Sequence, residues 1–347
     1  MAKTIVDVLS SNGYAGDRGF KKFNGDVGIE IETEASNPYE PPHLKYWSSH
    51  ADGSLRNFGI EYVLKGPVGR GKECREALEE WDNSVRKKFK LIPDSFSTSV
   101  HVHINFLNNT WLELWNFLCT YYLVENLLIR IAGETRRSNL FCLPLCDAEG
   151  ELQSITSLIS NIGSFRHGRL KTPPENYKYA ALNICNLTNL GTMEVRSLKG
   201  TTNINEIEKW INILLSIKDF SCREDINPAG IVELADQIGV EILYQIFGEY
   251  VTEFNDIKNK EELLKKNMYY VAKISSSSKF TDRDWGFPKP KKVYKEKMLE
   301  ELEKISLEMF KCEYKQLIPM YRIVVEETLA RSLNLQPKDV IFADGDQ

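Results

Sequence analysis

The sequence predicts an α+β fold in which strands dominate the first part of the chain and helices the remainder. Between residues 26 and 197, five short stretches alternate apolar and polar side chains, which is the two-residue period of a strand. Between them, apolar residues recur at helical spacing, and beyond residue 220 helical patterns dominate. We therefore divide the chain into a loosely held N-terminal lead-in (1–23), a mixed domain (24–220) and a mainly helical extension (221–347).

Composition narrows the class of protein. The 347 residues are 42% hydrophobic and 27% charged, as in a soluble globular protein with a full-sized core. A net charge of −5 argues against a protein whose main role is binding nucleic acid through its phosphates. The sequence has no apolar run near the roughly 20 residues that span a bilayer and no signal peptide, so we expect a cytoplasmic protein without a membrane partner.

The most informative stretch is residues 26–34. As a strand, it places Glu30, Glu32 and Glu34 on one face and Ile29 and Ile31 on the other. Three carboxylates on one face repel each other, and their oxygens suit hard cations such as Mg²⁺ or Mn²⁺. The alternative is a solvated face of an antiparallel sheet.

The next segments predict a loop and a second strand. Residues 35–58 are predicted as a long loop that ends in a turn at Asp52–Gly53, and residues 59–65 as a strand that carries Glu61. Residues 66–73 match the phosphate-loop pattern G-x-x-x-x-G-K. Glu73 stands where that pattern requires a Ser or Thr to bind Mg²⁺, so we interpret the segment as a tight connection to an amphipathic helix over residues 73–90.

A third strand is predicted at residues 97–105, with His101, His103 and Asn105 on its polar face. Paired histidines of this kind also hold transition metals in cupin-like oxygenases and hydrolases. A metal-dependent hydrolase or oxygenase is therefore an alternative to a hard-cation site in which one imidazole takes part.

Two further strands are predicted at residues 179–186, with Asn183 on the polar face, and at residues 191–197. In the second of these, Glu194 and Arg196 share a face. A guanidinium can hold two phosphate oxygens at once, so Arg196 fits phosphate binding. A plain ion pair with Glu194 at a sheet edge is the alternative.

Helices are predicted between and after these strands. Thr110 and Glu113 have the spacing of a capping box and begin an apolar helix that ends near Ala132. Further helices are predicted at residues 207–217, 231–247, 261–273 and 295–310. Because the polar faces of five strands combine Glu, His, Asn and Arg, we expect one shared site for divalent cations and a polyanion.

Six segments occur in the order of a known family and cover about residues 24–220. They are residues 28–34, 52–55 with 59–62, 101–105, 135–139, 179–183, and 191–196 with 200–201. In these segments the chain resembles the putative amidoligases, which are common in phages and fungi. That family belongs to the glutamine synthetase and glutamate–cysteine ligase superfamily of carboxylate–amine ligases.

The resemblance implies an antiparallel sheet curved into a half-barrel whose concave face holds ATP and Mg²⁺ (or Mn²⁺). It implies metal positions at Glu30, Glu32, Asp52, Glu61, His103 and Glu194. Arg196 would contact the γ-phosphate as a catalytic residue together with Glu194. Nucleotide or substrate binding would involve Arg136, Arg137, Asn105, Asn183 and Thr201.

The expected activity is therefore an ATP- and Mg²⁺-dependent ligation of a carboxylate to an amine through an acyl phosphate. The partners would be a small-molecule or peptide carboxylate and an amine co-substrate, in the host cytoplasm if the gene belongs to a phage. Besides the hydrolase or oxygenase that uses the His-Val-His strand, a second alternative is a non-catalytic protein on a degenerate ligase fold.

Overall fold

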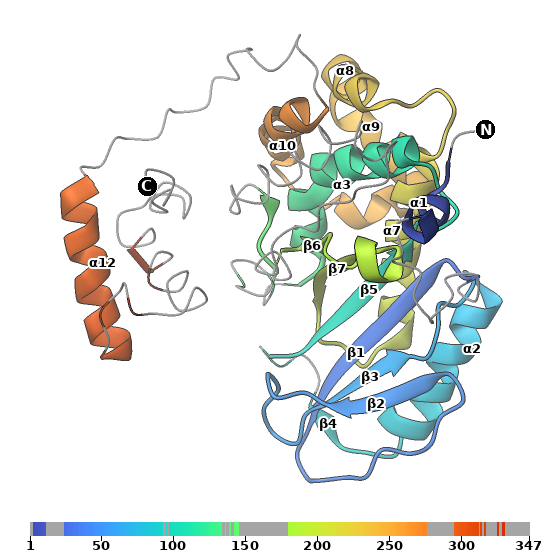
Figure 1. Cartoon of the computed structure of the whole chain (residues 1–347), viewed down its shortest axis with the longest axis vertical. Helices are drawn as coiled ribbons and strands as arrows, with labels where there is room; N and C mark the ends of the chain where they lie inside the picture. Colours follow the sequence, from blue (N-terminus) through green and yellow to red (C-terminus); the bar gives the residue numbers. More distant parts are fainter. Residues whose placement is uncertain are drawn as a thin grey trace.

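The computed structural model describes residues 3–11, 24–92, 97–133, 180–275 and 295–311. It also describes the single positions 95, 136, 139, 142–145, 313, 316, 325, 328 and 329. Within this part of the chain, an antiparallel sheet lies against a group of helices (Figure 1). The predicted α+β class is confirmed.

The sheet has seven strands in the order β2-β3-β1-β5-β7-β6, and β4 pairs with the end of β1. All pairs between these strands are antiparallel. The strands are β1 (Val27–Ala35), β2 (Trp47–Ala51), β3 (Ile60–Leu64), β4 (Leu91–Ile92), β5 (Ser99–Asn105), β6 (Leu182–Asn183) and β7 (Thr192–Lys199). The carboxylate strand β1 and the histidine strand β5 are therefore neighbours at the centre of the sheet.

The prediction of an unbroken loop over residues 35–58 is wrong, because this segment contains β2. Only its first residue, Trp47, is buried, and the last three residues of β2 are exposed. An edge strand of this kind lacks the alternation of buried and exposed residues that marks a half-buried strand. The two-residue strand β4 was not predicted either, because it is too short to show a period.

The α-helices of the described residues occur in both halves of the chain. They are α1 (Ile5–Ser11), α2 (Lys72–Trp81), α3 (Trp111–Ile131), α6 (Leu187–Leu190), α7 (Ile204–Ser221), α8 (Pro228–Ile238), α9 (Ile242–Phe247), α10 (Lys260–Ile274) and α12 (Lys295–Phe310). The capping box predicted at Thr110 and Glu113 is confirmed at the start of α3. Although α3 is long and mostly apolar, neither it nor another helix in the described ranges has the length and apolar character needed to cross a bilayer.

Three helical segments differ from the prediction. The helix predicted to end near residue 90 stops at Trp81 and is followed by a π-helical turn, Asp82–Arg86. The helix predicted at residues 231–247 is interrupted at Gly239, whose φ of 57° is unsuited to a continuing helix. Helix α1 lies in the predicted lead-in, and its residues Ile5 and Leu9 are buried in the core.

The core lies on one side of the sheet. Ile29, Ile31 and Val102, on the apolar faces of β1 and β5, are buried in the same cluster as residues of α3 and α7. Helix α7 contacts β5 and α3 contacts β7. A slip of one residue in β1 would move Ile29 and Ile31 out of this core and turn the glutamates of the strand into it, so the packing fixes the strand's register. The glutamates of β1 must then lie on the opposite face.

Helices beyond residue 220 also pack on this core, since α10 lies along α3 (Figure 1). The buried Asn267 of α10 donates from Nδ2 to the main-chain oxygen of Leu123 at 2.9 Å. Its Oδ1 accepts from Nδ2 of Asn126 at 2.6 Å. These bonds tie residues beyond 220 to the longest helix of the mixed domain. The domain boundary at residue 220 stays a prediction.

Replacing Asn267 with Ala tests how closely α10 is coupled to the sheet. The change removes two hydrogen bonds at a buried position, so we expect the free energy of unfolding to fall by about 2 kcal/mol. Urea unfolding followed by far-UV circular dichroism and by tryptophan fluorescence should show one shifted transition. Glu262→Ala, on an exposed position of α10, is the control. Two separate transitions would show that the C-terminal helices unfold independently.

Candidate functional site

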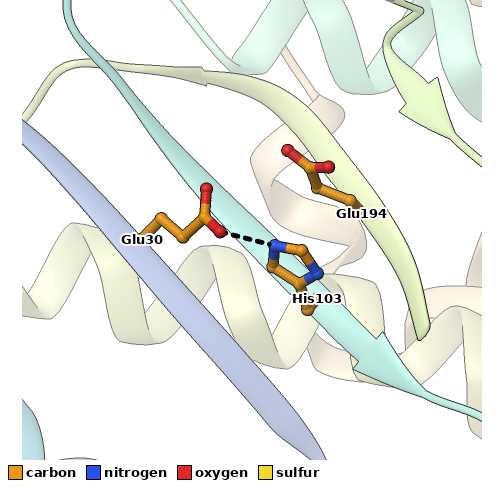
Figure 2. A group of neighbouring side chains, drawn as sticks. All are labelled: Glu30, His103 and Glu194. Atoms are coloured by element: carbon orange, nitrogen blue, oxygen red, sulfur yellow. Dashed lines mark hydrogen bonds and ion pairs between the residues drawn. The ribbon is translucent and has the colours of Figure 1, made fainter. Parts of the chain in front are cut away.

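The face of the sheet opposite the core brings acidic and histidine side chains together from three strands. Glu30 of β1, His103 of β5 and Glu194 of β7 point toward one another (Figure 2). Glu30 Oε1 accepts from Nε2 of His103 at 3.0 Å. The register explains the arrangement, because His103 pairs with Gly28 on one side and with Glu194 on the other. Gly28 leaves room for the imidazole, since a Cβ there would lie 3.3 Å from the Cβ of His103.

His101 lies at the centre of the same face and is only 2% exposed. Its Nδ1 lies 3.0 Å from Oε2 of Glu30, and its Nε2 lies 2.7 Å from Oγ of Ser99. It is also 3.4 Å from Oε1 of Glu194. His101 was predicted on the polar face but not among the metal positions, whereas the structure places it among the carboxylates.

Asp52 and Glu61 extend the cluster toward β3. Glu61 pairs with Glu32 across the β1–β3 ladder, and the loop before β3 brings Asp52 beside both. Three overlapping groups result, and within each the potential ligand atoms lie within 4.8 Å of one another. The groups are Glu30 with His103 and Glu194, Glu30 with Glu61 and His101, and Glu32 with Asp52 and Glu61.

Much of this polar face is buried. Glu32, His101 and Glu194 are among the buried polar residues, and Glu194 is only 3% exposed. Carboxylates withdrawn from water are costly unless cations or hydrogen bonds compensate them. Ser99 Oγ donates to Oε2 of Glu32 at 2.6 Å. The alternative of a solvated sheet face does not apply to these residues.

Within the described residues, Glu194 accepts hydrogen bonds from three side chains, besides its contact with His101. Its Oε2 accepts from Nδ2 of Asn183 at 2.7 Å and from Nδ2 of Asn186 at 2.6 Å, and its Oε1 accepts from Nη1 of Arg196. Strand β7 lies between β5 and β6, so the Glu194–Arg196 pair is not at a sheet edge. The strand predicted at residues 179–186 is wrong in its extent, because β6 has only two residues and Asn186 lies in the turn after it; in the predicted strand Asn186 would have faced away from Asn183, so it was not identified.

The charges in the cluster shift one another's pKa values. Burial opposes ionisation of Glu30, but hydrogen bonds from His101 and His103 outweigh it and hold its pKa well below the usual range. Burial likewise opposes protonation of His103, but Glu30 and Glu194 raise its pKa. Burial, followed by repulsion from Glu30 and Glu32, raises the pKa of Glu61 to about 7. The face therefore carries excess negative charge around Glu61, which a bound cation would relieve.

The remaining predicted binding residues have contacts of their own in the described part of the chain. Arg136 is buried, and its Nη2 donates to the main-chain oxygen of Arg196 at 2.7 Å. Asn105 donates from Nδ2 to the main-chain oxygen of Gly25 at 2.7 Å. Thr201 donates to Oε2 of Glu206 at 2.6 Å, near the start of α7. Their role in nucleotide or substrate binding stays a prediction, and Arg137 lies outside the described residues.

A sequence model of the family described as "Putative amidoligase enzyme" matches residues 43–218. The chain belongs to this family. The match covers Asp52, Glu61, both histidines of β5, and Glu194 with Arg196, whereas Glu30 and Glu32 precede it. No curated protein matches the chain. Membership of the amidoligase family indicates a ligase, in agreement with the resemblance found in the sequence.

Replacing Glu61 with Gln should stabilise the metal-free protein in a pH-dependent way. In the folded state Glu61 keeps its proton up to about pH 7, whereas a free glutamate, with a pKa of 4.5, loses it earlier. Ionisation therefore increasingly favours the unfolded state as the pH rises from 4.5 to about 7. Because Gln does not ionise, its advantage should grow over this window and then stay constant.

Unfolding free energies of both proteins, measured with a chelator at about pH 5 and about pH 8, provide the test. We expect the advantage of Glu61→Gln to be larger at the higher pH by on the order of 1 kcal/mol, below the full linkage value because Glu61 is only partly buried. A constant difference at the two pH values would contradict the raised pKa.

Proposed function

We propose that this protein is an ATP- and Mg²⁺-dependent ligase that joins a carboxylate to an amine through an acyl phosphate. The observation that carries the proposal is the set of three overlapping histidine and carboxylate groups on one buried sheet face, with Arg196 beside them. Membership of the amidoligase family supports a ligase. The half-barrel curvature of the sheet, with the nucleotide on its concave face, is part of the proposal.

The donor atoms fit hard divalent cations. Each group combines carboxylates with at most one imidazole, and oxygen-rich sites of this kind suit Mg²⁺ or Mn²⁺. The residues that would hold the ions are Glu30, Glu32, Asp52, Glu61, His103 and Glu194, with His101 as an addition to the predicted set. Bound cations would neutralise the phosphates of ATP. A hydrolase or oxygenase of the alternative kind would instead use both imidazoles of β5 on one transition metal.

Arg196 is positioned to act on the transferred phosphoryl group. Its side chain is 17% exposed and lies against Glu194, which Asn183 and Asn186 hold from the other side. Burial disfavours a charged guanidinium, but Glu194 and Glu32 outweigh burial and raise its pKa, so Arg196 stays cationic. In the proposal, this fixed charge contacts the γ-phosphate and stabilises the charge that develops during transfer.

The proposed reaction has two steps. An oxygen of the substrate carboxylate attacks the γ-phosphorus, the bond to the bridging oxygen breaks, and ADP leaves with that bond's electron pair. The amine nitrogen of the second substrate then attacks the carbonyl carbon of the acyl phosphate, phosphate leaves, and the nitrogen loses a proton. Because phosphate is the leaving group, the reaction requires no nucleophile from the protein.

The direct test of the proposal is a search for the two substrates. ATP hydrolysis with Mg²⁺ would be measured over mixtures of amino acids, small peptides and polyamines, and active mixtures would be analysed by mass spectrometry. A product lighter than its summed substrates by one water, formed together with ADP and phosphate, is the expected result. Tightly held iron or zinc in the purified protein, without ATP turnover, would favour the hydrolase or oxygenase.

Replacing Glu30 with Gln should weaken metal-dependent nucleotide binding while the protein still folds. Glu30 belongs to two of the three groups, and an amide is a weak ligand for Mg²⁺. Because His101 and His103 stabilise the ionised carboxylate, the change should lower the free energy of unfolding of the metal-free protein, and circular dichroism checks that the variant still folds. Calorimetric titration with Mg²⁺ and ATP should show an affinity loss of about tenfold or more, whereas the exposed Glu40→Gln should match the wild type. Unchanged affinity in Glu30→Gln would remove Glu30 from the site.

Replacing Arg196 with Lys should lower turnover and leave ATP binding largely intact. Lys keeps the charge but loses the planar fork that holds two oxygens. Steady-state ATP turnover with an identified substrate pair should fall by roughly two to three orders of magnitude, as when one preorganised donor is removed. If Arg196 serves only as the ion-pair partner of Glu194, Lys would replace it with full activity.

A further inference from the structure

Glu34, the third of the alternating glutamates on β1, has a different environment from the other two. Its side chain is only 2% exposed, and none of the potential metal groups within the described residues includes it. Its Oε1 accepts from the main-chain N–H of Arg56 at 2.8 Å, and its Oε2 lies 3.5 Å from Nδ2 of Asn57. Glu34 therefore contacts the loop of residues 52–58 that precedes β3.

The 52–58 loop is held in an unusual backbone conformation. Asn57 and Phe58 have φ values of 46° and 54°, in the left-handed region that non-glycine residues rarely adopt. Such residues persist only where their surroundings hold them. Within the loop, Leu55 packs closely on Gly59. A Cβ added at Gly59 would lie 2.1 Å from the Cβ of Leu55.

The loop is attached to the end of β1 at two points and carries Asp52 at its beginning. Besides the contact from Glu34, the main-chain oxygen of Asn57 accepts from the N–H of Ala35 at 2.9 Å. Asp52 accepts from the N–H of Ser54 through Oδ1 at 2.8 Å, which orients its carboxylate locally. The carboxylate of Asp52 then lies with those of Glu32 and Glu61 in one of the three potential metal groups.

We propose that Glu34 is a positioning residue that holds the 52–58 loop so that Asp52 reaches the metal group with Glu32 and Glu61. Glu34 shares the strand and face of the metal ligands, but its carboxylate binds the protein's own backbone. The proposal rests on the proposed function, because it takes Asp52 as a metal ligand. The N–H of Arg56, rather than its side chain, is the group that Glu34 holds.

Two substitutions at position 34 separate this role from direct metal binding. Gln lacks the charge but keeps an oxygen that can accept from the N–H of Arg56, whereas Leu has a similar size and no acceptor. Mn²⁺ binding to the metal-free full-length protein would be measured by electron paramagnetic resonance. We expect Glu34→Gln to bind within about threefold of the wild type and Glu34→Leu to bind about tenfold or more weakly, as is usual when a residue that supports a metal ligand is lost.

A double-substitution cycle tests whether the effect passes through Asp52. In an Asp52→Asn background, Glu34→Leu should add little further loss, because the ligand that Glu34 positions is already missing. Gly59→Ala, which displaces Leu55 from the other side of the loop, should weaken Mn²⁺ binding in the same Asp52-dependent way. Because Gly59→Ala does not change Glu34, it keeps the test valid if Glu34→Leu fails to fold. Glu40→Gln and Glu40→Leu are the matched controls on an exposed position.

The possible outcomes are distinct. A loss in Glu34→Gln as large as in Glu34→Leu would make Glu34 a metal ligand and overturn the positioning role. Wild-type affinity in Glu34→Leu or in Gly59→Ala, or a full additional loss in the Asp52→Asn background, would also overturn it. If the wild-type protein itself binds no Mn²⁺, the proposed metal site fails and this inference fails with it. If the wild type binds Mn²⁺ and Glu34→Leu binds it equally well, the positioning role fails and the proposed metal site stands.

Discussion

Several carboxylates are buried on one face of the sheet, and the side chains around them must offset the free-energy cost of that burial. Glu30, Glu32 and Glu194 lie within a cluster that is largely withdrawn from water. Carboxylates that lie close together repel strongly in a medium of low dielectric. The surrounding side chains offset part of this cost: the two imidazoles of β5 lie beside Glu30, and asparagine amides and a guanidinium surround Glu194. The compensation is incomplete at Glu61, where burial, followed by repulsion from Glu30 and Glu32, raises the pKa of the carboxyl group to about 7. A protein selected for stability alone would place apolar or neutral residues there, and in the proposed function a cation bound by the cluster would offset the cost.

The strands that carry the buried carboxylates also fix the geometry of the site. Because the apolar residues of β1 and β5 are buried against α3 and α7, the register of both strands is set on the core side, and the polar residues follow on the opposite side. Across the sheet this places Glu32 opposite Glu61 and His103 opposite Glu194. The site is therefore built mainly on the rigid centre of the sheet. Asp52 is the exception, because it comes from a loop. This loop, residues 52–58, is attached to β1 by hydrogen bonds.

The polar face could be predicted from the sequence because alternation is a local property that a few residues reveal. The alternation assigned the core residues of these strands to one face and the polar residues to the other. The polar residues assigned correctly are Glu30, Glu32, Glu61, His101, His103, Asn183, Glu194 and Arg196. Which residues become neighbours across the sheet is not a local property, because it depends on how the strands pair. Ser99 was not identified as a partner of Glu32, because a lone serine at a strand's start carries no signal until the pairing is known. Strand β2 was missed because three of its five residues are exposed, and Gly239 breaks a pattern that remains periodic on both sides of it.

Arg196 shows how the cluster and the proposed reaction fit together. In the protein alone, its guanidinium compensates the buried charge of Glu194, and its position depends on the Nη2 of Arg136 at its own main-chain oxygen. A cation bound by Glu30, His103 and Glu194 would take over that compensation, because it supplies two positive charges to the same carboxylates. The guanidinium would then be available to a phosphate oxygen without leaving Glu194 uncompensated. In the proposed function, metal binding therefore precedes the productive contact between Arg196 and ATP, and the ion pair of the free protein keeps the arginine in place until then.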